Sequence, residues 1–299
     1  MAELRQAHWI TRSGHEGQVG DREARFAYWS FTKTVIAALA LDLADRGKLD
    51  LDDSVPGATY TLRHLLQHNS GLPDYGTLPA YHQAVTAGET PWPRDEMIAR
   101  TLAQGRLFEP GDGWAYSNLG YTLAVAQIEA VACRPLSDLI QDRLALPLGL
   151  THLRLAQSPE DFNASPWRVR SPYDPAWVYH GCLVGTAGEA ARLLHAILHG
   201  PLLSEAARTQ MCDALPLGGA VTGRPWRSHG YGLGLMIGTF ATLGRAMGHG
   251  GTGPFSVASV LHFPDRDDPL TVACFAQGQD DGVTEWTVAE IAAATQTRP

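Results

Sequence analysis

The amino-acid sequence predicts an α/β (α+β) protein in which helices flank an antiparallel sheet built from both ends of the chain, with an all-α domain inserted between them. Strand patterns occur near the amino terminus and again in the last quarter of the chain, whereas helical patterns dominate from about residue 59 to residue 155. Strand-rich ends join into one sheet when the helices between them pack as a separate unit. We therefore expect residues 1–57 and 180–299 to form the α/β domain and residues 58–179 the all-α domain, with the active site in the cleft between them.

The composition limits the classes of partner. The chain has 299 residues, of which 44% are hydrophobic, and a formal net charge of −8, which suits a globular protein with a large core. It has no basic run, so we expect neither a nucleic acid nor an anionic membrane surface as partner. The amino-terminal segment lacks the apolar core of a signal peptide, and no stretch reaches the roughly 18 apolar residues of a membrane span. These features predict a cytoplasmic protein.

The amino-terminal part should contribute strands and then a buried helix. Two short strands are expected at 8–13 and 25–29. An apolar helix should run from Ser30 to about Arg46, because Gly47 is well placed to end it in a left-handed conformation.

The central block reads as helical throughout. Thr61 should cap a short helix that ends at His68. Further helical patterns lie at 81–87, 94–104, 121–132 and 136–144, with no convincing strand among them. The segment 158–179, rich in proline, tryptophan and arginine, predicts a long loop.

The last part of the chain returns to strands. Thr186 and Glu189 form a capping box that should start a helix ending at His199, and Ser204 should start another. An antiparallel meander is predicted from strand patterns at 231–238, 243–248, 255–263 and 270–277, with a hairpin turn at 264–268 and a closing helix at 285–297.

The first chemical motif is Ser30-Phe-Thr-Lys33, at the start of the first helix. Residues three apart on a helix share a face, so the Lys33 amine can accept the Ser30 hydroxyl proton. Lys33 and Lys48 are the two lysines of the chain, and all other strongly basic residues are arginines. Unlike arginine, a half-buried lysine can lose its proton near neutral pH. Alone, the pair is a weak signal and more often means a helix-capping serine and a surface lysine.

The second motif is Tyr116-Ser-Asn118, which follows a turn made by Gly111 and Gly113 and precedes a strongly apolar helix. A tyrosine can share a proton with a neighbouring lysine, and an asparagine amide can hold a substrate carbonyl or orient that lysine. By itself this motif also fits a helix cap beside a packed tyrosine.

The third motif, Gly248-His249-Gly250-Gly251-Thr252-Gly253, lies between two predicted strands. Backbone without side chains at a strand edge lets a substrate approach closely. A free N–H there can complete an oxyanion hole with the N–H of Ser30.

In this order and in these settings, the three motifs resemble those of penicillin-recognising serine hydrolases, the serine β-lactamase-like and penicillin-binding-protein-like enzymes. The similarity is to the branch that contains class C β-lactamases, DD-peptidases, D-aminopeptidases and related esterases, and it covers roughly residues 26–277. It extends to four further segments, namely 65–73, 108–111, 116–123 and 146–149.

The resemblance implies a role for each matching residue. Ser30 would be the acylated nucleophile, with Lys33 or the phenolate of Tyr116 as its base, and Tyr116 would also supply a proton to the leaving group. The N–H groups of Ser30 and Thr252 would form the oxyanion hole. The residues that bind or support the substrate would be Asn118, His249, Gly250, Gly251 and Thr252.

The chain departs from the family pattern at two points. The third motif often carries a lysine that favours a substrate carboxylate, where this chain has His249. Because a histidine is mostly neutral at pH 7, carboxylate recognition should be weaker, which argues against an efficient β-lactamase. In addition, 29 residues precede Ser30, fewer than relatives usually have. We therefore expect an exposed sheet edge that favours pairing into a homodimer.

Other patterns argue against metal, cofactor or disulfide chemistry. His64 and His68, and likewise His195 and His199, have a spacing that can bind zinc on a helix, but no third ligand is evident in the sequence. We therefore expect no metal site and no cofactor. The cysteines, widely scattered and without a Cys-x-x-Cys pair, predict buried free thiols; they are Cys133, Cys182, Cys212 and Cys274.

These features predict a serine hydrolase that forms an acyl-enzyme on a small ester or amide, as a carboxylesterase does. A β-lactamase or a D-amino-acid peptidase such as a DD-carboxypeptidase is the alternative within this chemistry. A catalytically silent ligand-binding module is the alternative from another class. The acyl group and the leaving group stay open at this point.

Overall fold

The computed structural model, which describes residues 5–167 and 173–295, contains an antiparallel sheet with the strand order β2-β1-β11-β10-β9-β8-β7-β6. Strands β6 to β11 follow one another as a meander, and β1 pairs with β11, so both ends of the chain meet in one sheet. This confirms the predicted fold class. The strands are β1 (Arg5–Thr11), β2 (Glu16–Val19), β6 (Leu215–Gly218), β7 (His229–Tyr231), β8 (Met236–Thr239), β9 (Arg245–Thr252), β10 (Ser256–Phe263) and β11 (Leu270–Gln277).

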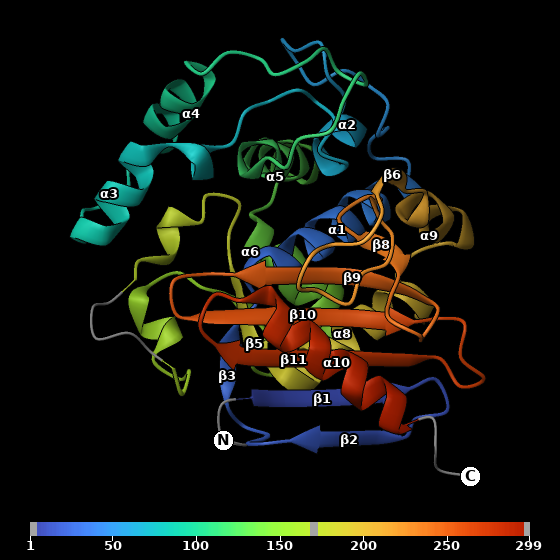
Figure 1. The fold of residues 1–299 in the computed structure, drawn as a ribbon. Helices are drawn as coiled ribbons and strands as arrows, with labels where there is room; N and C mark the ends of the chain where they lie inside the picture. The colour runs from blue at the N-terminus through green and yellow to red at the C-terminus, as the bar shows by residue number, and fades with distance from the viewer. Residues whose placement is uncertain (1–4, 168–172, 296–299) are drawn as a thin grey trace.

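Helices cover both faces of this sheet. In Figure 1, α10 (Asp281–Thr295) crosses the front of the central strands and α8 (Ala187–His199) lies behind them. Because successive side chains of a strand point to opposite faces, neighbouring residues of β10 enter different cores. Leu261 packs in the core that contains Val288 of α10, and Val260 in the core that contains Leu194 of α8. Coverage of both faces explains why every residue of β10 is buried, without the alternation of a half-exposed strand.

The remaining helices lie mostly above the sheet in the view of Figure 1. Their bounds are α1 (Thr32–Asp45), α2 (Leu62–Leu66), α3 (Pro79–Ala87), α4 (Arg94–Leu102), α5 (Asn118–Ala132), α6 (Leu136–Ile140), α7 (Leu146–Leu148) and α9 (Glu205–Cys212). Helix α1 contacts α5, α9 and β9, and it is buried from Thr32 to Asp42, as expected for a helix that is apolar all round. The division into domains at residues 57 and 179 stays a prediction.

Several boundaries differ from those predicted. The central helix expected to end at His68 ends at Leu66, and His68 has a left-handed φ of 60°. The closing helix begins at Asp281 rather than at residue 285, and its predicted last residues, 296 and 297, lie outside the described residues. The predicted strand 231–238 is broken by a turn between β7 and β8.

A second, smaller sheet was not predicted. It has the order β3-β5-β4, formed by β3 (Arg25–Ala27), β5 (Leu183–Thr186) and β4 (Arg154–Leu155). The expectation of no strand between about residues 59 and 155 is therefore wrong at β4, because a strand of two residues carries no readable alternation. The predicted loop 158–179 contains two short 3₁₀ turns, at Pro159–Phe162 and Pro175–Trp177, and its residues 168–172 lie outside the described part of the chain.

Three further predictions concern the cysteines, membrane-spanning helices and the edges of the large sheet. All four cysteines are free; Cys182 and Cys274 are buried as predicted, whereas Cys133 is exposed. Within residues 5–167 and 173–295, no helix combines the length and the apolar character that crossing a bilayer requires. The edges of the large sheet are β2 and β6, and the homodimer stays a prediction.

Candidate active site

Ser30 lies on a 3₁₀ turn between β3 and α1, in a strained stretch of backbone. The preceding residue, Trp29, has a φ of 45°, a left-handed conformation that costs a residue other than glycine about 1–3 kcal/mol. Packing holds it there: the Trp29 indole donates a hydrogen bond to Ser256 Oγ over 3.0 Å, and its ring meets that of Phe255 edge-on. The turn presents the Ser30 side chain to two adjoining cavities.

The glycines of the third motif let β9 approach this turn. A Cβ on Gly251 would lie 2.6 Å from the carbonyl oxygen of Tyr28 and 2.8 Å from the backbone nitrogen of Ser30. A Cβ on Gly253 would lie 2.2 Å from the Trp29 ring. The sequence placed His249 and its neighbours between strands, but β9 runs through Thr252. The absence of side chains therefore serves contact between two segments of this chain.

Lys33 lies one turn after Ser30 and is fully buried. Its Nζ is 3.0 Å from Ser30 Oγ and 2.7 Å from Asn118 Oδ1. It is also 2.5 Å from Nε2 of His180. Burial lowers the pKa of Lys33 to about 7, although the negative charge of Asp74 opposes this shift. Near neutral pH a large fraction of Lys33 is therefore the neutral amine, which can accept a proton.

Tyr116 contacts the same hydroxyl from the other side. Its phenol donates a hydrogen bond to Ser30 Oγ over 2.8 Å. Burial raises the pKa of Tyr116 well above its ordinary value, so the phenol keeps its proton in the pH range where Lys33 titrates. Of the two bases that the sequence left open, the electrostatics favours Lys33.

Asn118 is oriented by Asp74, a residue that the sequence interpretation missed. The backbone N–H of Asn118 donates to Asp74 Oδ1 over 2.9 Å, and its Nδ2 donates to Asp74 Oδ2 over 3.0 Å. The side-chain oxygen of Asn118 must therefore face Lys33. Burial raises the pKa of Asp74, and the hydrogen bonds from Asn118 and Gly76 oppose that rise. Asp74 directly follows the family-like segment 65–73, which was the one available signal for it.

His180 is a second residue that was missed. It is buried, its Nε2 contacts Lys33, and its Nδ1 has no hydrogen-bond partner among the described residues. Burial and the charge of Lys33 lower the pKa of His180 well below its ordinary value, so the imidazole is neutral beside the amine. Since 147 positions separate His180 from Lys33, no local pattern could reveal the contact. Five residues that meet here are called the lysine cluster below: Ser30, Lys33, Tyr116, Asn118 and His180.

The other predicted residues line the larger cavity at Ser30; they are His249, Gly250, Gly251 and Thr252. His249 is buried, and burial lowers its pKa to about 3, so its imidazole is neutral. Its Nε2 lies 2.9 Å from the Tyr231 hydroxyl. Thr252 donates a hydrogen bond from its hydroxyl to Asp281 Oδ1 over 2.5 Å.

Two cavities meet at Ser30, Asn118 and Thr252, with volumes of about 750 and 510 Å³. The smaller one is rich in aromatic residues and is lined by Trp29, Tyr75, Tyr81 and Tyr173, among others. In the larger one, Arg224 donates to both carboxylate oxygens of Glu285 and lies 3.4 Å from Asp281. Among the described residues that line the larger cavity, Arg224 is the one lysine or arginine, and two carboxylates already engage it.

Comparisons with known proteins show what the chain is similar to in sequence and fold. Penicillin-binding protein 4* of Bacillus subtilis (strain 168) is 32% identical over 144 residues, which are 44% of this chain and 30% of that protein. The D-alanyl-D-alanine-carboxypeptidase/endopeptidase AmpH of Escherichia coli (strain K12) is 30% identical over 145 residues, 44% of this chain and 37% of AmpH. The chain thus spans about a third of the length of these curated relatives.

Solved structures share the fold over nearly the whole chain. D-amino acid amidase from Ochrobactrum anthropi SV3 matches 100% of this chain and 95% of its own with a TM-score of 0.82 at 20% identity. A D-stereospecific amidohydrolase from Streptomyces sp. matches 91% of this chain and 89% of its own with a TM-score of 0.72 at 26% identity. A family model described as Beta-lactamase matches residues 7–294. The chain belongs to the Beta-lactamase family, whose members are hydrolases of the β-lactamase fold.

Proposed function

We propose that this protein is a serine hydrolase that acts through an acyl-enzyme on small amides and esters that carry no carboxylate. The observation that carries the proposal is the buried Lys33 amine, 3.0 Å from Ser30 Oγ and with its pKa lowered by burial to about 7. An amine of this kind can activate a serine hydroxyl, which is a weak nucleophile at its own pKa.

In acylation, Ser30 Oγ attacks the substrate carbonyl carbon while its proton passes to Lys33 Nζ. The tetrahedral intermediate then expels the amine or alcohol, which takes a proton from the Tyr116 phenol. The Lys33 ammonium, whose Nζ lies 4.9 Å from the centre of the Tyr116 ring, then returns a proton to the Tyr116 phenolate. Water next attacks the acyl-enzyme with Lys33 as base, the acid leaves, and Ser30 regains its proton.

The surroundings of Lys33 favour the neutral amine in one orientation. A neutral amine has two N–H bonds and one lone pair. Asn118 Oδ1 can accept one N–H, and His180 Nε2 can accept the other when the His180 proton is on Nδ1. The lone pair is then left to face the Ser30 hydroxyl. We propose His180 and Asn118 as positioning residues for the base, and the N–H groups of Ser30 and Thr252 as the oxyanion hole.

The charges in the larger cavity support the substrate class. Its one guanidinium, Arg224, already contacts the carboxylates of Asp281 and Glu285, so that group of three carries a net negative charge. His249, where many relatives have a lysine, is neutral because burial lowers its pKa to about 3. A substrate carboxylate would find no free cation among these residues, whereas a neutral substrate meets no repulsion and the ammonium group of an amino-acid amide is attracted by the net negative charge. The D-amino acid amidase and the D-stereospecific amidohydrolase support an amino-acid amide as the first candidate.

A substrate panel tests this proposal. Hydrolysis rates should be compared for D- and L-phenylalanine amide, p-nitrophenyl butyrate and a chromogenic cephalosporin, which carries a carboxylate. We expect turnover of an amide or ester, a loss of at least about 10⁴-fold in Ser30→Ala, and no loss in Ser54→Ala, which changes an exposed serine. A cephalosporin hydrolysed faster than every amide and ester would overturn the substrate class in favour of a β-lactamase. No turnover of any substrate would favour a silent binding module.

A further inference from the structure

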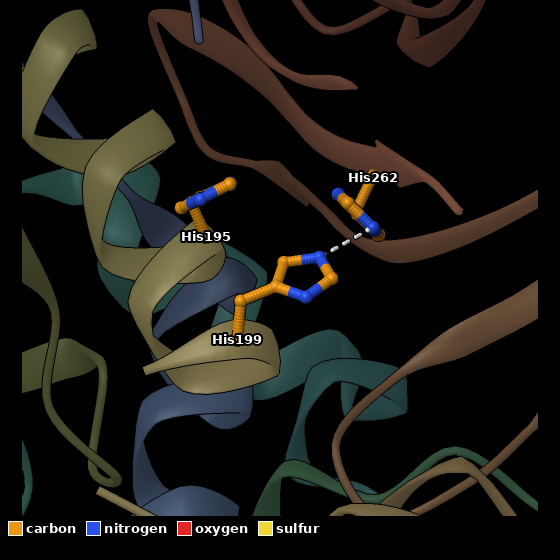
Figure 2. Close-up of side chains that lie close together, drawn as sticks. All are labelled: His195, His199 and His262. Carbon is orange, nitrogen blue, oxygen red and sulfur yellow. Dashed lines mark hydrogen bonds between the residues drawn. The ribbon is translucent and has the colours of Figure 1, made fainter. Parts of the chain in front are cut away.

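Three histidines converge between α8 and β10, away from the lysine cluster. His195 and His199 lie one turn apart near the end of α8, and His262 lies on β10. Figure 2 shows that the three side chains enter the same space between the helix and the strand. One ring nitrogen from each lies within 4.8 Å of the others, and the Nε2 atoms of His199 and His262 are 3.0 Å apart. These residues are called the histidine cluster below.

We propose that the histidine cluster binds one divalent transition-metal ion, with Zn²⁺ as the preferred ion. Zinc takes neutral imidazole nitrogens at about 2.0–2.1 Å in a tetrahedral arrangement, which places the nitrogens roughly 3.3 Å apart. The cluster therefore needs to contract by about 1.5 Å at its widest separation. His199 is exposed and His195 half-buried, so both rings have room to rotate. Solvent beside His199 can supply the fourth ligand.

Thr271 holds the rings in a way that suits metal binding. It is fully buried and is the register partner of His262 on β11. Its Oγ1 lies 2.9 Å from Nδ1 of His262 and 3.3 Å from Nδ1 of His195. A hydroxyl oxygen has two lone pairs and can accept both Nδ1–H bonds, which leaves the Nε2 lone pairs of these two rings free for a metal. Ligating histidines usually donate their second ring N–H in this manner.

The charges around the histidine cluster and its imidazole ligands together decide which ion can bind. Arg12 and Arg208 bring positive charge near His199. Arg12 also brings positive charge near His195, where Asp268 brings negative charge. Arg208 donates hydrogen bonds to the carbonyl of Gly200, just after α8, and to that of Leu203, and its positive charge still reduces the attraction for a cation. The site should therefore bind ions with a strong preference for imidazole, such as Zn²⁺ and Cu²⁺, and exclude Mg²⁺ and Ca²⁺, which prefer oxygen ligands.

The histidine cluster is separate from the proposed hydrolytic site. Val257, near the start of β10, pairs with Thr252 of the cleft, and His262 lies five residues further along the strand, about 17 Å away at the usual rise of a strand. A metal there would tie the end of α8 to β10. The inference thus stands or falls independently of the proposed function.

Zinc titration of the full chain tests the inference. The protein is first treated with a chelator and dialysed, and Zn²⁺ binding is then measured in competition with a chromophoric chelator. We expect saturation at one ion per chain with a micromolar dissociation constant. His199→Ala, which removes an exposed ligand, should weaken binding at least about 100-fold, and Thr271→Val should weaken it about 10-fold. His82→Ala, which removes an exposed histidine on α3, should leave it unchanged.

The melting temperature with Zn²⁺ and the visible absorption of bound Co²⁺ provide two further tests. Saturating Zn²⁺ should raise the melting temperature of the wild type by about 5 °C and that of His199→Ala by much less. Co²⁺ should give the intense visible absorption of a four-coordinate ion. The inference is overturned if no saturation occurs at one ion per chain, or if His199→Ala and Thr271→Val, both checked for folding by circular dichroism, bind as the wild type does.

Discussion

Two groups of nitrogen bases, each with at least one buried member, lie toward opposite ends of β10, and they differ in what surrounds them. In the lysine cluster, Lys33 faces the hydroxyl of Ser30, and Tyr116 donates to that same hydroxyl. In the histidine cluster, the neighbours of the imidazoles are other imidazoles and the Thr271 hydroxyl. Burial lowers the pKa of basic residues in both places.

The difference shows how the neighbours of a neutral base decide its use. A lone pair directed at an alcohol can take its proton and leave a nucleophile, provided that a nearby donor can serve the leaving group. Lone pairs that converge on one another have no such proton to take. They favour a shared cation, which can be a proton or a metal ion. Changes in the lysine cluster should therefore affect hydrolysis strongly, whereas metal at the histidine cluster should affect it little.

The largest effect is expected from Lys33→Met, which removes the proposed base and keeps a long apolar side chain. We expect kcat/KM on the best substrate to fall by about 10⁴-fold or more. Lys48→Met, which changes the other lysine of the chain at an exposed position, is the matched control and should retain full activity. Steady-state kinetics checks this, and a loss of less than tenfold in Lys33→Met would remove Lys33 from the mechanism.

Tyr116→Phe should have the next largest effect, about 10²- to 10³-fold on kcat. The loss should be greater for an amide than for a p-nitrophenyl ester, because an amine leaving group needs a proton and p-nitrophenolate does not. Measuring both substrates with the same enzyme preparation isolates this difference. Equal losses on the two substrates would argue against Tyr116 as the proton donor.

The same Lys33→Met variant should be more stable than the wild type. The pKa of Lys33 is lowered from 10.5 to about 7 in the folded state, so between these values the unfolded chain binds a proton that the folded protein does not. Lys33 therefore lowers the stability at pH 7, and this cost disappears as the pH rises toward 10.5. We expect Lys33→Met to raise the free energy of unfolding by about 1–3 kcal/mol at pH 7. Urea denaturation between pH 7 and pH 10 should show this gain shrinking, whereas a constant gain would refute the lowered pKa.

Asp74→Asn should have a smaller effect on rate and a diagnostic effect on the pH profile. The charge of Asp74 raises the pKa of Lys33, so its removal should lower that pKa further. We expect the acid limb of the kcat/KM profile, where Lys33 loses its proton, to move to lower pH. Activity at the optimum should fall about 10-fold, because Asn118 loses one orienting hydrogen bond. A limb that moves to higher pH would contradict this electrostatic account.

Removing or adding metal should have the smallest effect on the rate of hydrolysis. Removal of metal with EDTA, or saturation with Zn²⁺, should change kcat/KM by less than about twofold, because the histidine cluster lies about 17 Å along β10 from the cleft. Matched assays of the same protein with and without Zn²⁺ check this. A strong dependence would show that the two clusters are coupled.

Much of the fold could be predicted from the sequence because it is written in local patterns. The apolar run from Val35 to Leu41 and the glycine at position 47 correctly indicated α1, and the strand patterns after residue 243 correctly indicated the meander. The small sheet could not be predicted, since β4 has two residues and pairs with a strand more than 25 positions away. Two or three residues carry no periodicity.

The candidate site shows the same difference, between residues in local motifs and residues that only packing brings together. Ser30, Lys33, Tyr116 and Asn118 stand in short motifs, and the structure brings them together. Their roles stay proposals. His180 and His262 stand in no motif, and both come into contact through packing of segments far apart in the chain. His195 and His199 were visible as a pair on a helix, but the sequence could not show that β10 supplies a third imidazole.

The most direct test of the central claim, that Lys33 activates Ser30 as a nucleophile, is covalent labelling followed by intact-protein and peptide mass spectrometry. A fluorophosphonate should add one label to the wild type, on Ser30, and none to Ser30→Ala. In Lys33→Met, labelling should slow by orders of magnitude, whereas Lys48→Met should react as the wild type does. A label that persists in Ser30→Ala, or one that forms at the same rate without Lys33, would contradict the account.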